Sequence, residues 1–157
     1  MKKISFLNKL YKKEKLKLIT PSEDVKDSYI EKVESNLISA KILLDNDRLE
    51  EAVSLAYYGM YNSLLALLFK VGIKSENHTC SIILLKEVFA IDNFDILEAK
   101  KERIDKQYYT DFHIVKEEVE DAIKKSENFN KILFDFVSKM KNVDIKKYRE
   151  KFFSFLK

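Results

Sequence analysis

The sequence predicts an all-α fold, an antiparallel up-and-down bundle of about five main helices with a short helical segment at each end. Its 157 residues include only two glycines and one proline, whereas sandwiches and hairpins need turn residues every 8–12 positions. Apolar residues recur at steps of three and four over long stretches, which is the period of helices that bury one face. A chain of this length can fold as one domain around its own core.

The first elements follow from periodicity and helix-start residues. Residues 3–17 combine apolar side chains and lysines at helical spacing and predict a short amphipathic helix. Residues 20–24, TPSED, contain a hydroxyl group that can cap a helix, a proline and early acids. The first main helix should run from there to residues 45–47, DND. The second, residues 49–71, is apolar on nearly all sides and should lie at the centre of the bundle, with Gly72 as its C-cap.

The remaining helices are shorter or more polar. A polar loop at residues 74–77 should lead to a third helix through residues 82–89, and residues 92–93 should separate it from a fourth helix at 94–108. Residues 109–113 are interpreted as a turn. A fifth helix is expected at 115–137, and a short tail helix at 145–156. Short connections between long helices imply mostly antiparallel neighbours.

Charge divides the chain into three predicted regions: a basic amphipathic helix at 1–20, the bundle at 21–138 and a basic helical tail at 139–157. Residues 1–20 hold seven lysines and one glutamate, a net +6, and residues 139–157 hold seven basic and two acidic residues, a net +5. The whole chain has a formal charge of +3, so residues 21–138 hold −8. Basic termini favour RNA or another polyanion as a partner. The alternative is that lysine-rich helix faces are simply solvated, and each terminus taken alone favours it because lysine is abundant throughout.

Several functional classes find no support in the sequence. The single Cys80 excludes an internal disulfide, and the two histidines lie 35 positions apart, so no metal or cofactor is predicted. There is no glycine-rich phosphate loop and no nucleophile elbow. No apolar run reaches the ~20 residues of a membrane span, and lysines interrupt the apolar residues of the N-terminus, unlike a secretory signal. A cytoplasmic protein without a membrane partner is expected.

Four segments resemble the HEPN domain family. Residues 49–63, LEEAVSLAYYGMYNS, are similar to the family's second helix, where an acidic "eeA" start precedes a "yYaMfhaa" core. Residues 32–41, KVESNLISAK, are similar to the preceding "KAeesLeaAk" helix. Gly72, Ile73 and His78 match the loop "G…(p)k.H", and residues 103–112, RIDKQYYTDF, resemble the segment "R…Y..f". The resemblance covers roughly residues 25–138.

The resemblance implies a function on nucleic acid or nucleotides. HEPN proteins include ribonuclease toxins and nucleotide-handling partners of nucleotidyltransferases. Many HEPN ribonucleases have an Arg, then four to six residues, then a His, but here Tyr109 is six residues after Arg103 and His113 is ten residues after it. This is similar to the family's Arg-x4-x-Tyr pattern, found in toxins paired with a minimal nucleotidyltransferase antitoxin that can nucleotidylate the Tyr.

The candidate site follows from that pattern. The resemblance implies Arg103 and Tyr109 as catalytic residues, Tyr109 as the modification site, and His78, Lys106 and Tyr108 as RNA or nucleotide contacts. It also implies a homodimer, because Tyr109 lies about 240° around a helix from Arg103 and the two converge only at a helix end or between subunits. The predicted function is a metal-independent toxin-like endoribonuclease. The alternative is a non-catalytic dimeric module that binds a nucleotide or a nucleotidyltransferase.

The same residues have purely structural interpretations. Arg103 could pair across a dimer with a carboxylate such as that of Glu102 or Asp105. His78 could be a loop or helix-cap residue rather than a phosphate contact. Tyrosines 57, 58 and 61 could be core or dimer packing whose hydroxyl groups find partners. Tyr108 could be a core residue on a stripe with Leu97 and Ile104.

Overall fold

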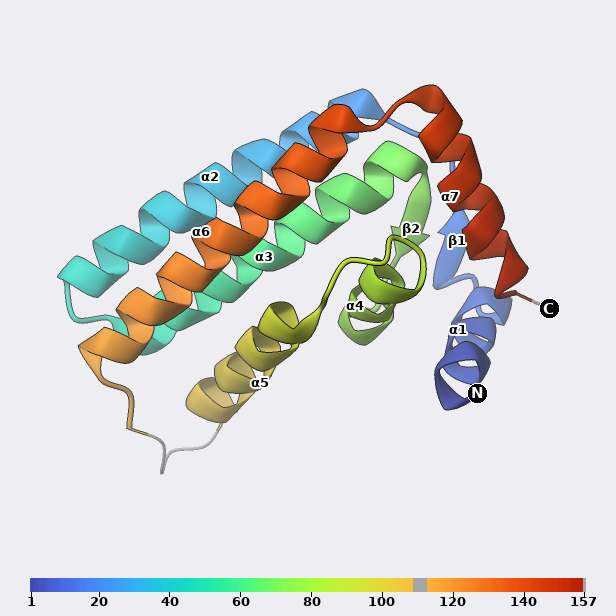
Figure 1. The fold of residues 1–157 in the computed structure, drawn as a ribbon. Coiled ribbons are helices and arrows are strands. Elements are labelled where there is room, and N and C mark those ends of the chain that lie inside the picture. Colours follow the sequence, from blue (N-terminus) through green and yellow to red (C-terminus); the bar gives the residue numbers. More distant parts are fainter. Residues whose placement is uncertain (109–112, 157) are drawn as a thin grey trace.

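Three long helices form the body of the protein. The computed structural model describes the backbone of residues 1–108 and 113–156 and the side chains of residues 1–104 and 113–156. Helices α2 (Glu23–Asp45), α3 (Leu49–Val71) and α6 (Lys116–Lys139) lie side by side along most of their length (Figure 1). The shorter α4 (His78–Glu87) and α5 (Phe94–Tyr108) cover another side of α3. The all-α prediction is confirmed.

The ends of the central helices lie where the sequence predicts them. The Ser22 hydroxyl accepts a hydrogen bond from the Val25 N–H at 3.1 Å and caps α2. Gly72 ends α3 with φ 83°, a left-handed conformation that favours glycine, and its N–H donates to the Leu68 carbonyl at 2.8 Å. These local signals fix α2 and α3 within about two residues of their predicted bounds.

Helix α3 is the core helix. By length and composition it could cross a membrane, but 67% of its most apolar window is buried inside the bundle, and the surrounding helices account for its apolar surface. It approaches α6 closely at Gly59, where an added Cβ would lie 3.1 Å from the Ser126 hydroxyl. Beside this contact, the buried Ser63 hydroxyl donates to Asn130 Oδ1 at 2.6 Å, and Asn130 Nδ2 donates to the Ser126 oxygen at 3.3 Å.

A small sheet near the N-terminus departs from the sequence prediction. The predicted helix over residues 3–17 ends earlier, as α1 (Lys2–Lys12), and Glu14 adopts φ 58°, which interrupts helical winding. Strand β1 (Leu16–Leu18) then pairs antiparallel with β2 (Ile73–Ser75), which occupies part of the predicted polar loop. The Leu16 and Ile73 side chains are fully buried, and their burial explains why these short segments are strands rather than loop or helix.

Helix α4 also begins earlier than predicted, because the Asn77 side chain accepts the Cys80 N–H at 2.9 Å and caps it. At the other end of the chain, α7 (Asn142–Ser154) starts three residues before its predicted position. The Asp144 carboxylate accepts the Lys141 N–H there at 2.8 Å. The buried Phe152 of α7 and Leu7 and Leu10 of α1 belong to the same apolar cluster as α3. The terminal helices therefore share the core of the bundle.

Candidate functional site

The Arg103 side chain lies against two tyrosines of α3. Its Nη2 donates a hydrogen bond to the Tyr58 hydroxyl at 2.8 Å. The guanidinium carbon lies 4.8 Å from the centre of the Tyr58 ring and 5.6 Å from that of Tyr57, within the range of cation–π attraction. Arg103 Nε is buried and has no hydrogen-bond partner among the described residues. The group is thus held by aromatic side chains with one donor unused.

His78 lies on the other side of the same tyrosines. It is the first residue of α4, and its Nδ1 lies 2.8 Å from the Tyr57 hydroxyl. Its ring stacks on Tyr61, with ring centres 3.8 Å apart and planes inclined by 15°, and meets Tyr58 edge-on at 6.5 Å. Tyr57 and Tyr58 therefore connect His78 to Arg103, although 25 residues separate the two in sequence.

This environment determines the proton state of His78. Burial lowers the pKa of His78 below its usual value of 6.5, and the positive charges of Arg103 and Lys100 lower it further. The imidazole is therefore neutral at neutral pH. Burial raises the pKa of Tyr57 well above its usual value of 10, so the Tyr57 phenol keeps its proton. Among the described residues none hydrogen-bonds His78 Nε2.

A second cation and a helix start complete this group, the Arg103 cluster, which consists of Tyr57, Tyr58, His78, Thr79, Lys100 and Arg103. Lys100 lies one turn before Arg103 on α5, and its Nζ donates to the Thr79 hydroxyl at 2.6 Å. Thr79 is in the first turn of α4, where free backbone N–H groups and the helix dipole favour negative charge. Two cations, tyrosine hydroxyls and a helix N-terminus thus face one place, a combination suited to a phosphate group.

A shell of small polar groups holds the first turn of α4 in position. The Ser81 hydroxyl donates to the Ser75 hydroxyl at 2.9 Å and lies 3.2 Å from that of Tyr61. Strand β2 supplies Ser75, so the β1–β2 pair that the sequence did not predict helps to orient α4. Together with the Asn77 cap, these bonds fix His78 relative to α3.

The predicted site residues have different outcomes. Arg103 and His78, predicted from separate segments, lie in one cluster. Lys106 and Tyr108 belong to the last turn of α5, and their side chains are outside the described residues, as is the whole of Tyr109. The proposed pairing of Arg103 with Tyr109 therefore stays a prediction.

Two structural interpretations can be judged. Core packing is confirmed for Tyr57 and Tyr61, which are 1% and 6% exposed. The predicted core stripe on α5 is wrong, because Leu97 and Ile104 are 43% and 36% exposed. The neighbouring Ile96 is fully buried in their place. The α5 helix is thus rotated so that Arg103, rather than Ile104, faces α3.

Sequence reasoning assigned Tyr57 and Tyr58 to packing, with hydroxyl groups that find partners, but it did not identify those partners. The available indication was that adjacent tyrosines stand in a helix predicted to be central, where each buried hydroxyl needs a partner. Their partners, His78 and Arg103, come from other helices. Periodicity within one helix could not identify them.

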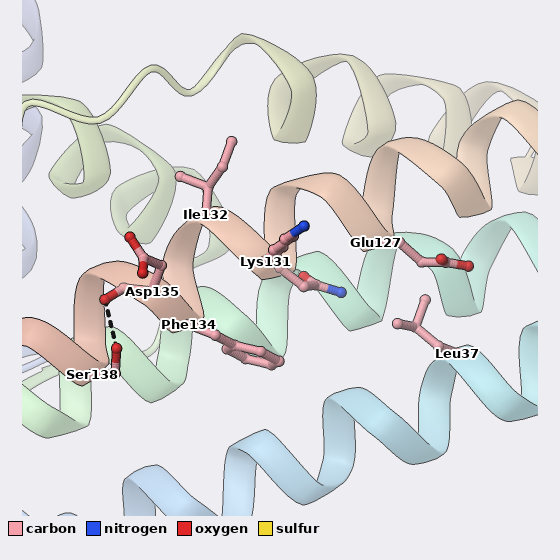
Figure 2. Close-up of a pocket in the computed structure, with 8 residues that line it drawn as sticks. Leu37, Glu127, Lys131, Ile132, Phe134, Asp135 and Ser138 are labelled. Atoms are coloured by element: carbon pink, nitrogen blue, oxygen red, sulfur yellow. Dashed lines mark hydrogen bonds between the residues drawn. The ribbon is translucent and has the colours of Figure 1, made fainter.

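A hollow of about 810 Å³ lies between α2 and α6. Figure 2 shows Leu37 of α2 and Phe134 of α6 pointing into this space. Its acids have partners: Glu127 pairs with Lys41 at 3.0 Å, and Asp135 with Lys139 at 3.0 Å. The exposed surface of the lining is mostly apolar. It therefore has fewer groups that could bind or react with a ligand than the Arg103 cluster. Within the described residues no three His, Cys, Asp or Glu side chains gather as a metal site.

Comparison with known proteins identifies related chains. The family model described as HEPN domain matches residues 27–135. A protein of Methanocaldococcus jannaschii named "Putative toxin MJ0605" is 32% identical over 107 residues, which cover 64% of this chain and 79% of that protein. The UPF0332 protein PH1297 of Pyrococcus horikoshii is 38% identical over 53 residues, 34% of this chain. That match spans 37% of the Pyrococcus protein, less than two thirds of its length.

Proposed function

Because the chain belongs to the HEPN domain family, we propose that it is a toxin-like endoribonuclease that binds an RNA phosphate at Arg103. One observation supports this most strongly: the half-buried Arg103, with an unused Nε donor, shares two tyrosines with a His78 whose pKa is lowered. The similarity to a protein named as a toxin agrees with it.

The cluster has the two groups that RNA cleavage through the 2′-hydroxyl requires. A neutral His78 can accept the 2′-hydroxyl proton at Nε2, provided that Nδ1–H donates to the Tyr57 oxygen. The 2′-oxygen then bonds to phosphorus and the 5′-oxygen leaves with a proton from Tyr109 or water, giving a 2′,3′-cyclic phosphate and a 5′-hydroxyl. Arg103 and Lys100 stabilise the charge on the phosphate oxygens. No metal ion is needed in this scheme.

The exposed stripe on α5 supports the homodimer. Phe94, Leu97 and Ile104 are 61%, 43% and 36% exposed, and Ile104 adjoins Arg103 in sequence. We propose that a second copy covers this stripe. The Arg103 side chain lies about 100° round the helix from Ile104 and faces α3, so it would lie beside this interface rather than within it. A nucleotidyltransferase antitoxin acting on Tyr109 is proposed as the partner that switches the activity off.

The decisive experiment expresses the wild-type chain and its Arg103→Ala variant and measures growth arrest together with cleavage of cellular RNA. Arg48→Ala is the matched control, because Arg48 is an exposed arginine at the far end of α3 whose side chain makes no helix cap. Wild type and the control should arrest growth and cleave RNA, and Arg103→Ala should do neither while keeping its helical circular dichroism.

Two results would overturn the proposal. Equal RNA cleavage by wild type and Arg103→Ala would remove Arg103 from the chemistry. An inactive wild type, free of antitoxin and folded, would leave the alternative function: a non-catalytic dimeric module that binds a nucleotide or a nucleotidyltransferase. Tyr109→Phe separates the two roles proposed for Tyr109, proton donor and modification site, since it should block nucleotidylation by the partner.

A further inference from the structure

The two basic ends of the chain come together at one end of the molecule, and we propose that this surface binds the phosphate backbone of RNA outside the Arg103 site. Figure 1 shows α1, β1 and α7 side by side, with both termini close to each other. We call this surface, residues 1–18 and 141–156, the basic end. The choice of RNA rests on the proposed function, whereas the surface itself does not depend on it.

Three kinds of contact fix the basic end. Phe152 of α7 is buried in the apolar cluster that includes Leu7 and Leu10 of α1. Arg149 Nη1 donates to the carbonyl oxygens of Ile19, Val71 and Gly72 at 2.8, 2.9 and 3.0 Å. Asn8 Nδ2 donates to the Phe155 carbonyl at 3.4 Å. The positive segments are therefore held together by the folded structure before any ligand arrives.

The lysines of the basic end remain in solvent. Only Lys3 has a carboxylate partner among the described residues, Glu87 at 3.9 Å, and the three acids Glu14, Asp144 and Glu150 leave a large positive excess. Exposed lysines on the surface are Lys2, Lys3, Lys9, Lys12, Lys13, Lys15, Lys17, Lys141, Lys146, Lys147 and Lys151. Solvation alone explains a lysine-rich helix face, but it does not require two such faces to pack together at a cost in mutual repulsion. Apolar packing of Phe152 and the hydrogen bonds of Arg149 overcome that repulsion, and a bound polyanion would relieve it.

The basic end contains a hollow along α1. It has a volume of about 670 Å³. The residues that line it are Met1, Ile4, Ser5, Asn8, Lys9, Lys12 and Lys13. Lys9, Lys12 and Lys13 are spaced along one helix face, so their ammonium groups can contact successive phosphates of a strand. An anionic membrane fits less well, because Leu7 and Leu10 of α1 are buried in the core and cannot insert into lipid, while Ile4 and Tyr11, 40% and 36% exposed, lie among lysines.

Helix α4 connects the basic end to the candidate site. Its first residue, His78, lies in the site, and its last residue, Glu87, pairs with Lys3 of α1. A ten-residue helix is about 15 Å long, so an RNA strand held at the α1 end of α4 would have to extend only about that far to reach His78. The basic end would thus raise the local concentration of RNA at the site.

The proposal is tested with a fluorescein-labelled single-stranded 20-nucleotide RNA, whose binding is followed by fluorescence anisotropy at several salt concentrations. Two double variants alter the basic end, Lys9→Glu with Lys12→Glu and Lys146→Glu with Lys147→Glu. The control, Lys124→Glu with Lys131→Glu, makes the same charge change at exposed positions of α6. Each basic-end variant should bind about tenfold more weakly at 0.1 M salt, with a salt slope smaller by about 1.4 for two lost phosphate contacts.

The outcomes are distinct. If both basic-end variants bind like wild type, or no more weakly than the α6 control, the inference is wrong. Tighter binding of wild type to phosphatidylserine vesicles than to RNA would also overturn it. Weakened RNA binding in the basic-end variants, with no RNA cleavage by wild type, would sustain this inference and reject the proposed function. RNA cleavage that is lost in Arg103→Ala, together with RNA binding that is unchanged in the basic-end variants, would sustain the proposed function and reject this inference.

Discussion

The Arg103 cluster and the basic end contain the same kinds of charge in opposite settings. Arg103 is half-buried, lies on tyrosine rings, and lowers the pKa of a neighbouring imidazole. The lysines of the basic end stand in water on helix surfaces and perturb no described group comparably. A desolvated cation acts strongly over a few ångströms, whereas solvated cations act weakly and are screened beyond ~10 Å at 0.1 M salt. The first setting suits chemistry on one phosphate, and the second suits attraction of a whole strand.

The largest expected effect is on RNA cleavage and tests the role of His78 in the Arg103 cluster. His78→Asn should lower the rate of RNA cleavage by about 10²–10⁴-fold, because it removes the proposed acceptor of the 2′-hydroxyl proton. Wild-type cleavage should decline as pH falls through the lowered pKa of His78, when the imidazole becomes protonated. Initial rates on a labelled RNA across pH measure both. Wild-type activity in His78→Asn would show that His78 only packs against Tyr61.

The next largest effect is on the free energy of unfolding and tests how Arg149 attaches α7 to the bundle. Arg149→Ala should lower the free energy of unfolding by about 1.5–3 kcal/mol, because three carbonyl groups lose a charged donor. RNA binding should weaken with it as α7 loosens. Urea denaturation provides the measurement, with the exposed Arg48→Ala as control. A loss no larger than that of the control would mean that apolar packing alone holds α7.

A smaller effect isolates the contact between Arg103 and α3. Tyr58→Phe keeps the ring under the guanidinium and removes the hydroxyl that accepts from Nη2 at 2.8 Å. Cleavage should fall about tenfold, which corresponds to ~1.4 kcal/mol, while RNA binding at the basic end should not change. Single-turnover rates and anisotropy distinguish these two quantities. A fall in RNA binding alone would contradict the division of labour between the two regions.

The smallest effect is on stability against pH. The folded pKa of His78 lies below its unfolded value of 6.5, so the unfolded chain takes up a proton first as pH falls. Stability present above pH 6.5 is therefore lost as pH falls from there toward the folded pKa. Between about pH 7.5 and about pH 5.5, wild type should lose more stability than His78→Gln in urea denaturation. Parallel losses in the two proteins would contradict the lowered pKa.

The fold was largely predictable because its boundaries are encoded locally. Ser22 and Gly72 mark the ends of α2 and α3 with caps that a reader of the sequence can recognise. Strands β1 and β2 were not predictable, since three-residue segments have no resolvable period and pair only through the fold. The early start of α4 depended on a side-chain cap by Asn77 within what seemed a loop.

The candidate site was predictable only in part. Arg103 and His78 came from a family resemblance, and their convergence needed three helices to pack. The rotation of α5, with Ile96 inward and Leu97 and Ile104 outward, could not be derived from a helix whose apolar residues fall on more than one face. The basic end was visible as two charged segments, but only packing of Phe152 and Arg149 places them together.

An NMR titration of the His78 imidazole in wild type and Arg103→Gln tests directly whether Arg103 and His78 form one electrostatic unit. Glutamine retains much of the side-chain volume and removes the charge, and the spectrum of His78→Gln assigns the resonance. The pKa of His78 should lie below 6.5 in wild type and rise in Arg103→Gln, because one of the causes that lower it is the Arg103 charge. A His78 pKa that does not change on loss of the Arg103 charge, or that lies at or above 6.5 in wild type, would contradict the account.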